Sequence, residues 1–177
     1  MNFFTWFYCL DIPAAIGLVA VTTVAFLHLK ARFENRRFWK TAVWSLAAVW
    51  LVMVIYLTVM RREPSDTQES AWIPFYSYYL AFTGVNRELL RSGLMNVLLF
   101  YPAGVLAVSL MGKESGIRKR AILAAAGCCV LSMLIEISQY VWGLGLAETD
   151  DVIHNTVGSF LGMLSGGLPL CSGIKKH

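Results

Sequence analysis

The sequence predicts an all-α integral membrane protein: a bundle of about five transmembrane helices, with an aromatic interfacial loop or short helix between the second and third. With 57% hydrophobic and 15% charged residues, the 177-residue chain is too apolar for a soluble domain. Its apolar stretches approach the roughly 20 residues that a spanning helix needs. The basic residues behind the net charge of +4 lie in short runs between these stretches, as in membrane proteins, so no nucleic-acid partner is expected.

The five spans are expected at residues 12–29, 41–60, 93–111, 121–142 and 152–170. The first is long enough to be retained as a span, and no basic segment of a secretory signal precedes it. No internal repeat or soluble domain interrupts the series. We therefore expect a single membrane domain over residues 1–177.

The distribution of lysine and arginine predicts the orientation. Residues 30–40, 113–120 and the tail carry eleven of the fifteen basic residues, whereas residues 61–91 carry four and residues 143–151 none. Basic loops remain in the cytoplasm. The prediction is a multi-pass protein of the cell membrane with its N-terminus outside and its C-terminus in the cytoplasm.

An aromatic segment occupies the outer loop, residues 61–92. Aromatic rings are typical of the boundary between headgroups and hydrocarbon. The alternative is a plug packed over the helix bundle, and both arrangements place Arg87 and Arg91 near phosphate headgroups. The rings are Trp72, Phe75, Tyr76, Tyr78, Tyr79 and Phe82.

The fourth predicted span contains Glu136 and Gln139 on one helical face. A carboxylate in hydrocarbon costs about 2.5 kcal/mol or more, unless it is neutralised, paired or hydrated. Ser132 lies one turn earlier on the same face, so the three residues form a polar stripe. This stripe is expected to face protein and not lipid.

More polar residues enter the membrane at the same depth, because the third and fifth spans both begin on the outer side. We therefore predict an outward-facing polar site, with His154 bonded to Asp150 one turn away. No metal-binding spacing such as HExxH occurs, so neither a metal nor another cofactor is expected. The primary candidates are Glu136, Gln139, Asp150, Asp151 and Asn155, and the secondary candidates are Asn96, His154, Glu148 and Ser132.

Small residues repeat along the fifth span at Gly158, Gly162 and Gly166, and the third span carries Gly93 and Gly104. Such residues let helix backbones approach closely, and they mark packing more often than chemistry. We expect the third, fourth and fifth helices to pack tightly around the polar site.

Four motifs in order resemble those of the VanZ family of bacterial membrane proteins. They are Trp72-Ile-Pro-Phe75, Asn96-x3-Phe100-x-Pro102-x-Gly104, Ser132-x3-Glu136-x2-Gln139 and Asp150-Asp151-x3-Asn155-x2-Gly158-x3-Gly162. The resemblance implies a single VanZ-like domain, with motifs within residues 72–166, in the envelope of a bacterium. Teicoplanin resistance is the phenotype for which the family is named.

The chain departs from the family pattern just before the acidic pair. Family members often have an arginine where this chain has Gly143 to Gly145, and an aspartate where it has Glu148. Arg87, Arg91 or a protonated carboxyl group is then expected to compensate Glu136.

Three hypotheses follow. In the first, the outward site binds an anionic lipid, a lipid-linked cell-wall intermediate or a lipoglycopeptide, with Glu136 as a hydrogen-bonding group or protonation switch. In the second, the protein is a membrane-embedded enzyme in which Glu136 is general acid or base while Asp150, Asp151 or His154 positions water or a divalent metal. In the third, Glu136, Gln139 and Asn155 only bond one another and fix helix register.

Overall fold

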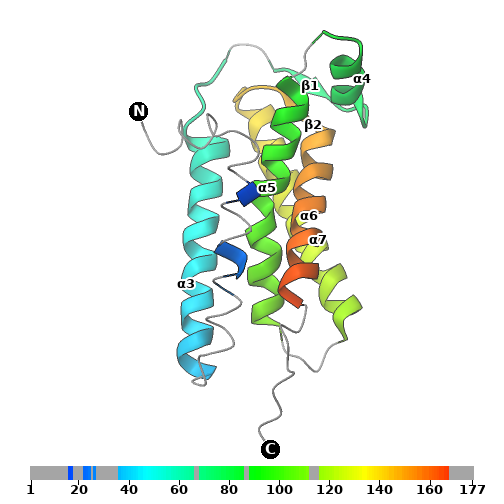
Figure 1. Ribbon diagram of the computed structural model, residues 1–177. Coiled ribbons are helices and arrows are strands. Elements are labelled where there is room, and N and C mark those ends of the chain that lie inside the picture. Colours follow the sequence, from blue (N-terminus) through cyan, green and yellow to red (C-terminus); the bar gives the residue numbers. More distant parts are fainter. Residues whose placement is uncertain are drawn as a thin grey trace, which may run out of the picture.

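The computed structural model describes residues 16–17, 22–24, 26, 36–65, 68–85, 88–111 and 116–167. Four long helices run side by side (Figure 1): α3 (Arg36–Ile55), α5 (Glu88–Leu110), α6 (Ile117–Val141) and α7 (Thr149–Gly167). Helix α3 continues as a π-helical turn, η1 (Tyr56–Met60), and a short helix, α4 (Tyr76–Phe82), precedes α5. The predicted all-α fold class is confirmed.

Three helical segments among the described residues are long and apolar enough to cross a membrane: Arg37–Met60, Glu88–Leu110 and Arg118–Val141. They match the second, third and fourth predicted spans. The fifth predicted span coincides with α7, whose first turns are polar, and the first lies almost entirely outside the described residues. The total of about five spans therefore stays a prediction.

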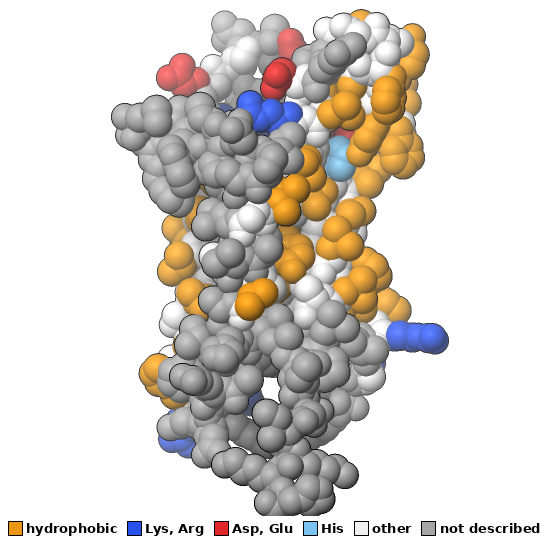
Figure 2. All heavy atoms as spheres, in the orientation of Figure 1, with side chains coloured by type: hydrophobic (Ala, Val, Ile, Leu, Met, Phe, Trp, Pro, Cys, Tyr) orange, Lys and Arg blue, Asp and Glu red, His pale blue; other side chains and the backbone are white. Residues whose placement is uncertain are grey.

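The outward faces of α3 and α6 carry large apolar side chains whose exposure to water would be unfavourable. Trp44, Val52 and Ile122 are each more than 60% exposed. On the face drawn in Figure 2, hydrophobic side chains cover much of the described surface between charged groups near the two ends. Exposed apolar surface of this kind is the expected lipid-facing side of a membrane bundle.

Helix α5 lies at the centre of the bundle, and its contact with α7 depends on glycine. A Cβ atom on Gly104 would lie 1.8 Å from the Ser159 carbonyl oxygen, and one on Gly162 would lie 1.9 Å from that of Tyr101. On the other side of α5, Trp50 of α3 packs edge-on against Phe100. The small residues thus bring two backbones into direct contact, as their spacing predicts.

Two loops are joined at the end of the bundle that carries α4, which we call the site end. The Ser65 N–H donates to the Gly143 carbonyl (2.8 Å), and the Ala147 N–H donates to the Glu69 carbonyl (3.1 Å). Strands β1 (Ser70–Ala71) and β2 (Ala147–Glu148) then pair in parallel. These contacts fix the loop before α4 over the connection between α6 and α7.

Candidate functional site

Glu136 lies in the last turns of α6 at the site end, and only 3% of its surface is exposed. Its Oε2 accepts a hydrogen bond from the Glu148 backbone N–H at 2.9 Å. The side chain therefore points into protein toward the connection that leads to α7. The other members of its stripe, Ser132 and Gln139, are also buried.

The carboxylates of Glu148 and Asp151 lie within electrostatic range of Glu136. Asn96 of α5 donates a side-chain hydrogen bond to Asp151, so α5, α6 and α7 all contribute to one cluster. Glu148 and Asp151 are partly buried, whereas Glu136 is fully buried. We use the name acidic site for this cluster together with one nearby arginine. Its members are Glu136, Glu148, Asp151, Asn96 and Arg62.

Arg62 supplies positive charge to all three carboxylates. It follows η1, is exposed at the rim, and donates from Nη1 to the Leu144 carbonyl at 3.2 Å. Gly145 has a φ of +117°, and a Cβ there would lie 2.9 Å from Arg62 Nη1. The absence of a side chain at Gly145 thus leaves room for the guanidinium.

The cation in the acidic site was not identified from the sequence. Of the expected arginines, Arg91 forms an ion pair with Glu88 at 3.8 Å, and Arg87 lies outside the described residues. The sequence placed Arg62 at the end of a span, where basic residues usually mark topology. The signal that points to it is Gly145, which leaves space for the guanidinium.

Asp150 was a primary site candidate, yet its carboxylate is occupied by α4. It is 2% exposed and accepts hydrogen bonds from the Phe75 N–H, the Ser77 N–H and the Ser77 hydroxyl. Phe75 is the N-cap of α4 and has a left-handed backbone, φ 64°. A carboxylate at this position satisfies N–H groups that the first helical turn leaves unpaired. Asp150 therefore anchors α4 to α7.

His154 does not bond Asp150, so that expectation is wrong. Its Nε2 lies 2.8 Å from the Tyr78 hydroxyl, because the Asp150 oxygens are already turned toward the start of α4. The imidazole packs on Gly93, where a Cβ would lie 2.5 Å from His154 Cε1. The buried Nδ1 has no hydrogen-bond partner within the described part of the chain.

The purely structural hypothesis required hydrogen bonds among Glu136, Gln139 and Asn155. The structure shows none between these three side chains. Asn155 Nδ2 donates to the Ser132 hydroxyl at 2.7 Å, and Gln139 Nε2 donates to the Thr58 carbonyl in η1 at 3.0 Å. The amide oxygens of these two side chains, Gln139 Oε1 and Asn155 Oδ1, are buried without a partner among the described residues. Each polar group instead joins a different pair of segments.

The pKa of Glu148 is raised from its ordinary value of 4.5 to about 7, first by burial and then by the charges of Asp151 and Asp150, against the opposing charge of Arg62. The folded protein therefore holds this proton more tightly than the unfolded chain. Its contribution to stability should fall as pH rises from about 4.5 to about 7.

We expect Glu148→Gln to remove this part of the pH dependence. Thermal unfolding of the purified protein across that pH range measures it, with the exposed Glu63→Gln as the control. A Glu148→Gln profile parallel to that of the wild type would contradict the assignment.

Among the described residues, no group of three or more His, Cys, Asp or Glu side chains has the geometry to hold a metal ion. The acids of the acidic site point instead to hydrogen-bond donors and to Arg62. The chemistry available there is acceptance of hydrogen bonds, attraction of cations and proton exchange.

Comparison with known proteins places these residues in a family. The sequence profile of the VanZ/LLP1 family matches residues 43–168. The chain is 31% identical over 131 residues to Protein VanZ of Enterococcus faecium, which covers 70% of this chain and 72% of that protein. No solved structure matches the chain significantly.

Proposed function

We propose that this chain, which belongs to the VanZ/LLP1 family, binds the polar part of a lipid or lipid-linked envelope component at the acidic site, on the outer side of the bacterial cell membrane. By shielding that component, the protein confers resistance to glycopeptide or lipoglycopeptide antibiotics such as teicoplanin. The observation that carries the proposal is the gathering of Glu136, Glu148 and Asp151 from separate segments around one exposed arginine.

The charge balance of the acidic site selects the kind of group that it accepts. Among the described residues, Arg62 is the one cationic group that faces these three acidic side chains, so a bare phosphate would find little positive charge to balance it. Hydroxyl and ammonium groups, in contrast, donate hydrogen bonds to carboxylates and are attracted by their charge. Sugar, peptide and amine parts of an envelope component fit this site, while Arg62 at the rim is placed for an anionic linker.

Exposed aromatic side chains beside the acidic site favour a ligand that carries a lipid chain. Phe75 is 60% exposed, Tyr79 63% and Phe82 80%, all in or next to α4. Rings at the membrane boundary pack against acyl or isoprenoid chains and leave polar groups in water. Since Asp150 anchors α4 to α7, the apolar rim and the acidic site are held together.

The enzyme alternative retains Glu136 as general acid or base and Asp151 as the residue that positions water, but it loses two of its candidates to other contacts. Asp150 already accepts three hydrogen bonds from α4, and His154 is bonded to Tyr78. A buried carboxyl group beside another acid is nevertheless a typical arrangement for proton transfer. Product formation from the ligand distinguishes catalysis from binding.

We expect Glu136→Gln to weaken ligand binding by about tenfold or more, because the amide group puts N–H donors where the ligand's own donors need an acceptor, and an unsatisfied buried group costs roughly 1–3 kcal/mol. The isosteric amide keeps an acceptor for the Glu148 N–H, so the fold should be retained. The measurement is binding of a polyprenyl-linked cell-wall precursor, and separately of teicoplanin, to the protein in liposomes. Mass spectrometry of the recovered ligand reports any turnover.

The matched control is Glu88→Gln, at the exposed start of α5 and outside the acidic site. In a susceptible Gram-positive host, the wild type and Glu88→Gln should raise the teicoplanin concentration needed to stop growth, while Glu136→Gln should not. Equal binding and equal resistance for all three proteins would overturn the proposal. Ligand converted by the wild type but not by Glu136→Gln would establish the enzyme alternative.

A further inference from the structure

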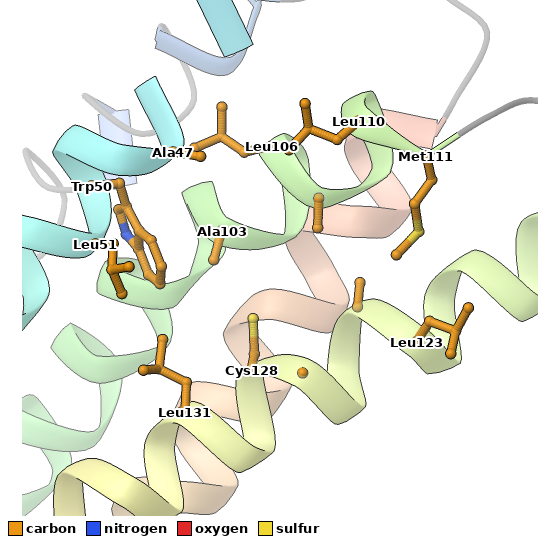
Figure 3. A pocket seen from close by; sticks show the side chains of 13 residues that line it. Ala47, Trp50, Leu51, Ala103, Leu106, Leu110, Met111, Leu123, Cys128 and Leu131 are labelled. Atoms are coloured by element: carbon orange, nitrogen blue, oxygen red, sulfur yellow. The ribbon is translucent and has the colours of Figure 1, made fainter. Parts of the chain in front are cut away.

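A second site lies in the opposite half of the bundle, away from the acidic site. An apolar cavity of about 330 Å³ opens between α3, α5 and α6. Figure 3 shows Trp50 and Leu51 of α3, Leu106 and Leu110 of α5, and Leu131 of α6 around it. Its volume lies at the lower end of the range for ligand pockets.

Helices α3 and α6 both pack on α5, and the cavity lies between them below the site end. At the site end they are joined through the Gln139 bond to Thr58, 3.0 Å long. Away from the site end, the inner faces of the three helices carry several small residues that line the cavity: Ala47, Ala103, Ala107, Ala124 and Gly127. A Cβ on Gly127 would meet no atom within 4 Å. The small side chains here leave space open, in contrast to the glycines between α5 and α7.

The first turn of α6, just before the cavity-lining residues Leu123 and Ala124, is basic. Arg120 precedes Ala124 and Gly127 by four and seven residues, so it continues the cavity-lining face of α6. Its Nε is buried, and no described residue accepts a hydrogen bond from it. Arg118 and Lys119 are exposed in the same first turn. Buried polar groups normally have a partner, and an anion at this position would provide one.

We propose that the cavity holds one acyl chain of an anionic bilayer phospholipid, with the phosphate of that lipid bound by Arg120 at the end of α6. The occupant follows from the surroundings, since α3 and α6 are apolar enough to cross a membrane and the cavity opens between them. A basic cluster at the headgroup level attracts anionic lipid. Under the predicted topology this lipid belongs to the inner leaflet, and the inference does not depend on the function proposed for the acidic site.

The test uses the full chain in nanodiscs of phosphatidylcholine mixed with phosphatidylglycerol, and native mass spectrometry reads the retained lipid. The wild type should retain one phospholipid and prefer phosphatidylglycerol by about fivefold or more. Gly127→Leu fills the cavity, so it should retain about tenfold less lipid. Ala126→Leu makes a similar addition on the exposed side of α6 and should behave as wild type.

Arg120→Gln distinguishes the contribution of the lipid headgroup to binding from that of the acyl chain. This variant should lose the preference for phosphatidylglycerol and still bind phosphatidylcholine. Should Gly127→Leu fail to fold, Leu123→Trp narrows the cavity from its half-exposed rim and serves as the second steric variant. Equal lipid retention by a folded cavity-filling variant and Ala126→Leu would overturn the inference. So would equal retention of both lipids by the wild type, or a second copy of the chain in place of lipid.

Discussion

Gly162→Ala is expected to destabilise the protein by about 3 kcal/mol or more, because the new methyl group would meet backbone and not a movable side chain. Its Cβ would lie 1.9 Å from the Tyr101 carbonyl oxygen and 3.2 Å from the Val105 backbone nitrogen. Helices α5 and α7 would have to separate, and Asn96 would then move away from Asp151. Thermal unfolding in detergent, followed by circular dichroism, measures the loss.

Gly127→Ala is the matched control, since it makes the same substitution in a membrane helix where an added Cβ has free space. This variant should unfold at or above the wild-type temperature, because alanine is the better helix former by about 1 kcal/mol. If Gly162→Ala were as stable as Gly127→Ala, the close contact between α5 and α7 would be wrong. Loss of binding at the acidic site should accompany loss of stability in Gly162→Ala only.

Most of the helical framework could be predicted from the sequence, because length and hydropathy determine which segments can cross a membrane. The spans predicted at residues 41–60, 93–111 and 121–142 correspond to helical segments whose bounds differ from the prediction mainly at their ends. The start of α3 at Arg36 and of α5 at Glu88 could not be predicted, because polar turns outside hydrocarbon leave no hydropathy signal. The π-helical turn η1 likewise has no signature in the pattern of apolar residues.

The partners of the polar residues were harder to predict than their positions. Periodicity places Glu136 and Ser132 on one face, but it does not reveal that each bonds a different segment, Glu148 and Asn155. Arg62 could not be assigned, because its position beside the acids depends on the loop contact between Ser65 and Gly143. That contact requires Gly143, with a φ of +60°, since a Cβ there would lie 2.4 Å from the Ser65 carbonyl oxygen.

The VanZ-type motifs acquire a physical meaning when they are read as pairs. Trp72 accepts a hydrogen bond from the Thr149 hydroxyl, and Phe75 donates one to Asp150, so the first motif docks on the last. Asn96 of the second motif bonds Asp151. Gly145 leaves room for Arg62, which comes from another loop. The positive charge is thus supplied from a different segment of the chain.

Asp150→Ala is expected to release α4 from the bundle and to cost about 3 kcal/mol, because hydrogen bonds to a carboxylate contribute roughly 1.5–3 kcal/mol each and are not additive. Without Asp150, the Ser77 N–H and hydroxyl lose their buried acceptor. Phe75 would also lose support for its left-handed backbone, which is unfavourable for a residue with a side chain. Thermal unfolding measures stability, and limited proteolysis measures exposure of residues 72–85.

Asp151→Asn is the control that separates anchoring from chemistry, since it removes a neighbouring charge from the acidic site without touching α4. We expect Asp150→Ala to be cleaved near α4 while Asp151→Asn resists the protease as the wild type does. Ser77→Ala should fall between them, because the Asp150 carboxylate keeps its two backbone donors. If Asp150→Ala abolished ligand binding with α4 still protected and stability unchanged, the carboxylate would belong to the binding site and not to the anchor of α4.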